Sequence, residues 1–212
     1  MPADYDTDPG RFEANALSTS LFSRNGDIHA GVAGRIAAQG CSLALDVGGG
    51  TGVLARLLLD LNVSTVVVDR ARHVARAPGP AVRADALSLP FRAEVFDAAA
   101  ALWMLHHVTD PVAALAEMSR VLRPGGPLVI STSSRWNDPE LAWALPHWGR
   151  PTSFDAENAP ELLDALFDID ELTVWDAPLM TLPDRAAVAL FLRGRRVPQR
   201  KAVEMARSVQ VP

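Results

Sequence analysis

One stretch limits the fold more than any other part of the chain: residues 43–55, LALDVGGGTGVLA. A short apolar run carries Asp46, four glycines follow within residues 48–52, and an apolar, helix-forming run resumes at once. Glycine adopts backbone angles that other residues avoid, and it lets a ligand approach the main chain without an intervening side chain. We therefore expect a buried strand at 43–47, a ligand-binding turn, and a helix at 51–59.

The alternation of strand and helix continues along the chain. We expect four further strands, at residues 64–68, 81–84, 95–102 and 128–132. We expect four further helices, at residues 12–22, 28–38, 110–122 and 156–166. Asp110 precedes Pro111 and is the expected N-cap of its helix. Alternating elements of this kind form a parallel sheet with right-handed crossovers. The predicted fold class is α/β: a Rossmann-like, doubly wound, mostly parallel sheet with helices on both faces.

Chemically useful side chains stand where these strands end. Asp46, Asp69 and Asp85 close the first three strands, and His106 and His107 follow the fourth. Open parallel sheets bind their ligands beyond the carboxyl ends of the strands. We therefore expect these side chains to meet at one edge of the sheet, around a common ligand.

Three kinds of glycine-rich turn compete for the stretch at 43–55. A phosphate-binding loop needs a lysine and a hydroxyl residue after the glycines, where this chain has Val53 and Leu54. A dinucleotide fingerprint needs a third glycine at the position of Val53, although Asp69 would suit a ribose, so a dehydrogenase stays an alternative. A carboxylate just before the turn, Asp46, repels a pyrophosphate but suits a ligand with a cationic amine.

Four motifs in order resemble those of the class I S-adenosylmethionine-dependent methyltransferases, specifically the small ubiquinone-biosynthesis-like branch (methyltransferase type 11). LDVGGGTG resembles the first motif and VVVDR the second. RADALSLPF and FDAAAALWMLHHV resemble the third and fourth, and LRPGGPLVIST resembles the element that leads into strand five. The resemblance covers about residues 43–132.

The resemblance implies S-adenosylmethionine as the cofactor and S-adenosylhomocysteine as its product. The first motif is implied to hold the methionine part, Asp69 the ribose hydroxyls, and Asp85 with the Ala86 backbone the adenine edge. Arg70 stands where the family often has an apolar residue that packs on the adenine. The implied cofactor-site residues are Asp46, Gly48, Gly50, Gly52, Asp69, Arg70, Asp85, Ala86 and Trp103.

Methyl transfer from a sulfonium needs an aligned nucleophile and a site without water. A base is needed only where the nucleophile must lose a proton, and histidine suits that role near neutral pH. His106 and His107 are therefore the candidates for positioning the acceptor or for acting as a general base.

Aromatic residues gather in the segment that follows the fifth strand, residues 133–156. Aromatic side chains at this density are typical of a lid or pocket wall for an apolar or cationic acceptor, or of a loop fastened to its core. The candidates for the acceptor pocket are Trp136, Trp143, His147 and Trp148, with Tyr5 from the N-terminal segment.

The C-terminal part departs from the family pattern. Residues 167–175 are predicted to form a sixth strand, and residues 183–196, PDRAAVALFLRGRR, a helix. We therefore expect strand seven to be missing or atypical, through truncation or because residues 188–193 replace it. The chain is expected to form one methyltransferase domain over 1–212, with a cofactor core at about 40–132, an acceptor lid at 133–156 and a C-terminal segment at 157–212.

Composition narrows the functional classes. A net charge of −5 argues against nucleic-acid binding driven by charge. The single cysteine, Cys41, excludes an internal disulfide and a multi-cysteine metal site, and we expect no metal. With neither an apolar leader nor a long apolar run, the chain is expected to be cytoplasmic, without membrane contact, as a monomer or homodimer.

The sequence thus predicts an enzyme that methylates an oxygen or nitrogen atom of a small molecule, with carbon as the next choice. Two alternatives stay open. One is a tRNA or protein methyltransferase that uses the arginine-rich C-terminal tail as its contact surface. The other is a non-catalytic, cofactor-binding regulatory protein of the same fold.

Overall fold

The computed structural model describes residues 5–24, 28–176 and 179–209, so the first four and last three residues of the expected domain lie outside it. Its helices are α1 (Pro9–Phe22), α2 (Ile28–Ala38), α3 (Val53–Asp60), α4 (Pro111–Val121), α5 (Ala159–Asp164), α6 (Arg185–Gly194) and α7 (Gln199–Ala206). Short 3₁₀ turns are η1 (Arg72–Arg76), η2 (Leu105–His107) and η3 (Pro139–Leu141). The strands are β1 (Leu43–Val47), β2 (Ser64–Asp69), β3 (Ala81–Arg83), β4 (Ala98–Leu102) and β5 (Leu128–Ser131).

The chain divides into two compact units. The sheet unit contains residues 28–134 and 151–170, and the helical unit contains the described residues of 4–27, 135–150 and 171–212. All five strands belong to the sheet unit, while α1, α6 and α7 belong to the helical unit. The expectation of a single domain over 1–212 stays a prediction.

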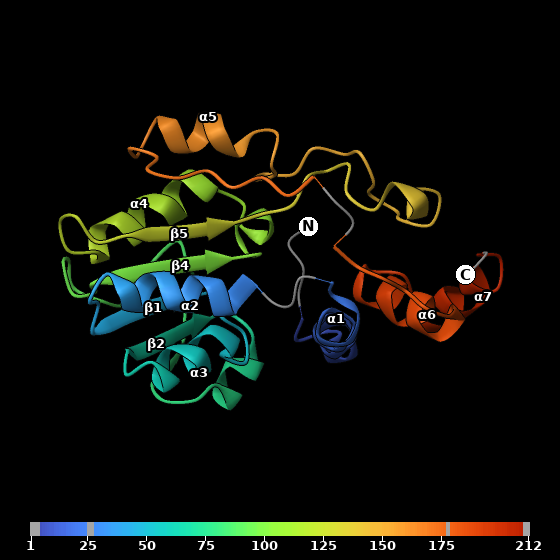
Figure 1. Ribbon diagram of the computed structural model, residues 1–212, viewed down its shortest axis with the longest axis horizontal. Coiled ribbons are helices and arrows are strands. Elements are labelled where there is room, and N and C mark those ends of the chain that lie inside the picture. Colours follow the sequence, from blue (N-terminus) through green and yellow to red (C-terminus); the bar gives the residue numbers. More distant parts are fainter. Residues whose placement is uncertain (1–4, 25–27, 177–178, 210–212) are drawn as a thin grey trace. The chain divides into compact units, whose positions relative to one another are not determined.

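The five strands form one parallel sheet in the order β3-β2-β1-β4-β5, and Figure 1 shows them lying side by side. Asp46 of β1 is in register with Val67 of β2 and with Ala100 of β4. This topology confirms the predicted doubly wound α/β fold.

Both faces of the sheet are covered by helices. Ala98 and Ala100 of β4 pack with α2 and α3, whereas Ala99 and Ala101 pack with α4 and α5. Successive side chains of a strand point to opposite faces, so a strand buried on both sides consists entirely of apolar residues. The alanine run of β4 is fully buried for this reason.

The C-terminal part differs in one respect from the prediction. Residues 168–176 contain neither helix nor strand, and Leu172 and Val174 are 65% and 74% exposed, so the predicted sixth strand is wrong. The apolar alternation there has the period of a strand, but a strand forms only where a neighbour accepts its backbone hydrogen bonds. No strand in the described part of the chain pairs with this segment.

The helix predicted at 183–196 is confirmed as α6. The Asp184 side chain accepts a hydrogen bond from the Ala187 backbone N–H at 2.8 Å, which caps the helix. Residues 188–193 are therefore helical, and the sheet of the described residues has no seventh strand. Within those residues, no helix combines the length and apolar character that a membrane crossing requires.

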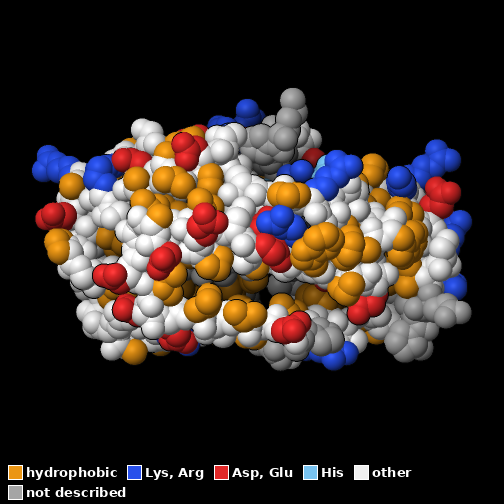
Figure 2. Space-filling view, turned by 90° about the horizontal axis from the view of Figure 1, so that it is seen from above, with side chains coloured by type: hydrophobic (Ala, Val, Ile, Leu, Met, Phe, Trp, Pro, Cys, Tyr) orange, Lys and Arg blue, Asp and Glu red, His pale blue; other side chains and the backbone are white. Residues whose placement is uncertain are grey.

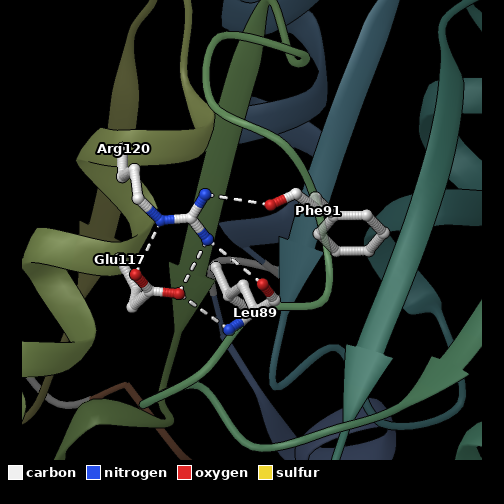
Figure 3. Close-up of polar contacts among 4 residues, drawn as sticks. All are labelled: Leu89, Phe91, Glu117 and Arg120. Atoms are coloured by element: carbon white, nitrogen blue, oxygen red, sulfur yellow. Dashed lines mark hydrogen bonds and ion pairs between the residues drawn. The ribbon is translucent and has the colours of Figure 1, made fainter.

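A charged pair on α4 fixes the loop that follows β3 (Figure 3). Glu117 accepts hydrogen bonds from Arg120 Nε at 2.7 Å and from the Leu89 backbone N–H at 2.9 Å. Arg120 in turn donates to the carbonyl oxygens of Leu89 and Phe91 at 3.1 and 2.9 Å. The pair therefore anchors the end of the loop that begins at Asp85.

Asp97, just before β4, ties the amino ends of two strands together. Its Oδ2 accepts hydrogen bonds from the Ser42 hydroxyl at 2.7 Å and from the backbone N–H groups of Ser42 and Leu43, both at 2.9 Å. Its Oδ1 pairs with the Arg123 guanidinium. The Ser42 hydrogen bonds, together with those from Leu43 and the charge of Arg123, lower the pKa of Asp97 to about 2.

We expect Asp97→Asn to lower the free energy of unfolding at pH 7 by about 1–2 kcal/mol. A carboxyl whose pKa is depressed by folding stabilises the native state above its unfolded pKa, and loses that effect as the pH falls through its folded pKa. The gap between variant and wild type should therefore narrow from pH 4 towards pH 2. Urea denaturation at several pH values measures it, with the exposed Asp164→Asn as control; an equal gap at every pH would contradict the prediction.

Candidate active site

The topology brings the predicted acids and histidines at the strand ends to one edge of the sheet unit. β3, β2, β1 and β4 are consecutive neighbours, so their carboxyl ends lie next to one another. Asp69 is the last residue of β2, Asp46 lies one residue before the end of β1, and Asp85 follows β3 by two residues. The turn η2, which contains His106 and His107, follows β4. This arrangement was predictable because strands joined by crossovers all run in the same direction.

The glycine turn between β1 and α3 leaves no room for a side chain at Gly48 or at Gly52. Gly48 has φ +70°, and a Cβ there would lie 2.6 Å from the Cβ of Met104. Gly52 has φ +74°, and a Cβ there would lie 2.7 Å from the Cδ of Pro78. Both the left-handed backbone and the close neighbours therefore require glycine.

Asp69 holds this turn in place. Its Oδ2 accepts a hydrogen bond from the Gly50 backbone N–H at 3.0 Å, and its Oδ1 accepts one from the Ala71 N–H at 2.8 Å. His73 Nε2 lies 3.9 Å from Asp69 Oδ2. Sequence analysis did not single out His73. The available signal in the sequence was the spacing of four residues between Asp69 and His73. This spacing brings the two side chains together only because His73 lies in the turn η1.

Asp46 is the most unusual ionisable group of the sheet unit. It is 2% exposed, and within the described residues its Oδ2 has no hydrogen-bond partner. Burial raises the pKa of Asp46 to about 7, while His29 acts to lower it and the charge of Asp69 to raise it further. A Cβ at Gly49 would overlap the Asp46 carboxylate, so the turn packs directly on this group. A buried carboxyl with a vacant oxygen is suited to a cationic ligand.

The remaining candidates for cofactor binding make hydrogen bonds and packing contacts with other residues of the sheet unit. Asp85 is exposed, and its Oδ1 accepts a hydrogen bond from the Leu87 N–H at 3.0 Å, while Ala86 is buried. The Arg70 carbonyl oxygen accepts a hydrogen bond from Arg83 Nε at 2.8 Å. Trp103 has φ +57° and packs beside the α2 and α3 cluster. The binding roles of these residues stay predictions.

The two histidines of η2 lie against each other. The ring centroids of His106 and His107 are 4.0 Å apart, and both side chains are half-buried. The His107 backbone N–H donates to the Met104 carbonyl oxygen at 2.8 Å, which closes the turn directly after β4. Met104 also contacts the space beside Gly48, so the same short segment borders both the histidines and the glycine turn.

The predicted acceptor-pocket residues all belong to the helical unit: Tyr5, Trp136, Trp143, His147 and Trp148. The rings of Trp136 and Trp148 meet edge to face at 5.0 Å, and Trp148 Nε1 donates to the Asn137 carbonyl oxygen at 2.9 Å. Trp143 is 57% exposed. These contacts order the aromatic segment internally, and its role as an acceptor pocket stays a prediction.

Comparison with known proteins agrees with this architecture. Residues 45–130 match the family described as a methyltransferase domain. The chain is similar to ubiquinone/menaquinone biosynthesis C-methyltransferases UbiE, with 32% identity over 145 residues in Hahella chejuensis and 34% over 142 residues in Chromobacterium violaceum. Each match covers 58% of this chain and 58% of the relative, so the chain spans little more than half the length of these relatives.

Two solved structures share the fold. The crystal structure of the [4+2]-cyclase SpnF has a TM-score of 0.55 and 23% identity, over 78% of this chain and 74% of that one. A possible histamine N-methyltransferase from Thermotoga maritima has a TM-score of 0.55 and 19% identity, over 76% of this chain and 77% of that one. From motifs, topology and relatives together, residues 45–130 resemble the class I S-adenosylmethionine-dependent methyltransferases of the ubiquinone-biosynthesis-like branch.

Proposed function

We propose that this protein binds S-adenosylmethionine at the sheet edge and transfers its methyl group to a small molecule. The observation that supports this most directly is Asp46, a buried carboxyl with a vacant oxygen packed against the glycine turn. S-Adenosylmethionine carries an ammonium and a sulfonium group, and both are cations that a buried carboxylate stabilises. When bound, the cofactor supplies an electrophilic methyl group.

The residues present fit such a ligand. The turn at Gly48 and Gly52 excludes side chains, so the amino acid part of the cofactor can approach the backbone. Asp69 would accept the ribose hydroxyls while it keeps the Gly50 N–H, because a carboxylate has acceptor sites for several donors. The loop at Asp85 and Ala86, anchored by α4, would border the adenine.

The chain's part in the chemical step is alignment and proton control. An in-line displacement proceeds fastest when the nucleophile is held at a near-attack distance in a site without bulk water. His106 and His107 follow β4 beside the glycine turn and are the groups that would orient the acceptor. One of them would take the acceptor's proton where the acceptor must lose one.

For the acceptor we propose a small molecule that is methylated on oxygen or nitrogen. The acidic net charge and the aromatic segment of residues 136–148 support a small acceptor over an RNA or a membrane surface. Carbon is the second candidate atom, because the UbiE relatives are C-methyltransferases. The single cysteine, Cys41, supports a reducing, cytoplasmic setting.

Two measurements test the proposal. Titration calorimetry of the full chain should detect S-adenosylmethionine and S-adenosylhomocysteine, and should detect no NAD. Transfer of a tritium-labelled methyl group to a panel of phenols, amines and quinols, followed by NMR of the product, identifies the methylated atom. Binding of neither nucleoside would overturn the proposal. Binding without transfer to any acceptor class would favour a cofactor-binding regulator.

We expect the replacement of His106 or His107 by alanine to separate the two roles of these residues. If the acceptor must lose a proton to one imidazole, the kcat of that variant should fall by about 100-fold or more, because general-base catalysis contributes that much. Binding of S-adenosylhomocysteine should stay at the wild-type level. A loss in kcat below about tenfold with both variants would contradict a general-base role and leave positioning.

A further inference from the structure

Arg11 of α1 is a buried guanidinium with two donors that lack acceptors in the described part of the chain. Its side chain belongs to a residue that is only 8% exposed, and its Nε and Nη2 atoms are both buried. Neither atom has a hydrogen-bond partner within the described residues. A guanidinium group stays charged in proteins and presents five N–H donors, so two buried donors without acceptors are costly.

Within the described residues, the neighbours of Arg11 supply no hydrogen-bond acceptor to its Nε and Nη2 atoms. The ring of Tyr5 covers one face of the guanidinium, with Arg11 Cζ 4.2 Å from the ring centroid. A ring on the face leaves the N–H donors, which point along the edge of the guanidinium plane, without acceptors. The charge of Arg11 contributes to lowering the pKa of Asp8. The two carboxylate oxygens of Asp8, however, pair with Arg193.

The pairing of Asp8 with Arg193 is a complete ion pair. Arg193 Nη1 lies 2.8 Å from Asp8 Oδ2, and Arg193 Nη2 pairs with Asp8 Oδ1. The hydrogen bonds from Arg193 lower the pKa of Asp8, and those to Asp8 raise the pKa of Arg193. Both carboxylate oxygens of Asp8 therefore pair with Arg193, and neither accepts a hydrogen bond from Nε or Nη2 of Arg11.

A third arginine, Arg196, is affected by the charge of Arg11. Partial burial and then the charge of Arg11 lower the pKa of Arg196, while Tyr5 acts in the opposite direction. Arg196 has φ +71° just after α6, a backbone conformation that favours glycine or asparagine. Figure 2 shows Lys and Arg side chains spread over the face that it views, at both of its ends and near its middle.

We propose that Arg11 and Arg196 form a binding site for an oxyanion, a phosphate or carboxylate group, with Tyr5 on the face of Arg11. A tetrahedral or planar oxyanion accepts two parallel hydrogen bonds from a guanidinium, which is the geometry that the vacant Nε and Nη2 of Arg11 offer. Bound there, the anion would supply the missing acceptors and the missing negative charge. The site consists of helical-unit residues alone and does not depend on the proposed methyl transfer.

The test is the thermal stability of the full chain as sodium phosphate or sodium acetate replaces sodium chloride at constant ionic strength. A ligand that binds only the folded state raises the melting temperature, and for a chain of this size we expect a rise of ~4 °C at saturation. A rise with phosphate alone identifies a phosphate site, and a rise with both salts identifies a general oxyanion site. The absence of a rise with either salt would overturn the proposal.

Arg11→Met separates binding from folding. It removes a buried guanidinium with two donors that lack acceptors within the described residues, so in chloride its melting temperature should equal or exceed that of the wild type, while its response to phosphate disappears. Arg196→Gly removes the second cation at a backbone angle that glycine accepts, and should reduce the response by at least half. Arg207→Gln, an exposed arginine after α7, is the charge-matched control and should respond like the wild type.

The responses of these variants to phosphate support or overturn the proposed oxyanion site. An Arg11→Met variant that responds to phosphate as the wild type does would overturn the proposal, as would an Arg207→Gln variant that loses the response. If Arg11→Met fails to fold, Arg196→Gly carries the same comparison, because its substitution relieves backbone strain. A full response in Arg196→Gly would then refute the two-arginine site.

Discussion

Replacing Asp69 by alanine should weaken the binding of S-adenosylhomocysteine by about 100-fold or more, because the substitution removes two interactions at once. The carboxylate fastens the glycine turn through the Gly50 N–H at 3.0 Å, and it is the proposed acceptor for the ribose hydroxyls. A charged hydrogen bond contributes roughly 1.5–3 kcal/mol, and loss of the turn's anchor adds to the effect. Asp69→Ala would therefore remove a contact to the ligand and a contact to the glycine turn that holds the ligand.

Calorimetric titration of the purified variant measures this loss directly. Asp60→Ala, at the exposed end of α3, is the matched control and should bind like the wild type. Asp69→Asn keeps an acceptor oxygen and should lie between the two, because a neutral amide oxygen is a weaker acceptor than a carboxylate. If Asp69→Ala bound the nucleoside as tightly as Asp60→Ala does, the proposed ribose contact would be wrong.

The second large effect concerns pH. The affinity for S-adenosylhomocysteine should rise by up to about tenfold per pH unit below pH 7 and level off above it. Burial raises the pKa of Asp46 to about 7, with Asp69 acting in the same direction and His29 against it. The ammonium group of the ligand binds the ionised form of Asp46. Below pH 7 the carboxyl must first lose its proton, and this cost lowers the affinity.

Asp46 should make the stability of the ligand-free chain fall as the pH rises, whereas it makes the affinity for S-adenosylhomocysteine rise. A carboxyl whose folded pKa lies above its unfolded value stabilises the native state below the unfolded pKa, and this contribution is lost as the pH rises through the folded pKa. Asp46→Asn should therefore be more stable than the wild type at pH 8, by roughly 2–4 kcal/mol, and equal to it near pH 4. Urea denaturation of the ligand-free chain at both pH values measures this difference.

The two readouts identify the titrating group. Asp46→Asn should bind S-adenosylhomocysteine weakly and with no slope between pH 6 and pH 8. His29→Gln is the control, because His29 is the neighbouring group whose charge lowers the pKa of Asp46. Loss of the slope in His29→Gln, with the slope preserved in Asp46→Asn, would contradict the assignment to Asp46.

Local features of the fold were predictable from neighbouring residues alone. The Asp110–Pro111 pair predicted the start of α4, and the structure has Asp110 Oδ1 accepting from the Ala113 N–H at 3.0 Å. The β-branched run 64–68 and the glycine turn predicted β2 and the start of α3 equally well. Side-chain period, capping and glycine angles depend on residues a few positions apart, so the sequence contains them in full.

The position of the candidate acids and histidines at strand ends was predictable from the sequence, whereas their electrostatics were not. Strand-end acids follow from the motif order, and the parallel topology brings them to one edge. The burial of Asp46 depends on α2, on the glycine turn and on both neighbouring strands, which are distant in sequence. His73 became a neighbour of Asp69 only when η1 formed, and no motif pointed to it.

The sequence by itself determined the order of the first five strands, the glycine turn after the first of them, and the placement of three acids and two histidines at strand ends. Only the tertiary structure decided that residues 168–176 stay unpaired, that the pKa of Asp46 lies near 7, and that two donors of the buried Arg11 lack acceptors within the described residues. The physical reason is common to all three. Backbone pairing and burial are properties of residues far apart in the chain, whereas periodicity and backbone angles are properties of adjacent ones.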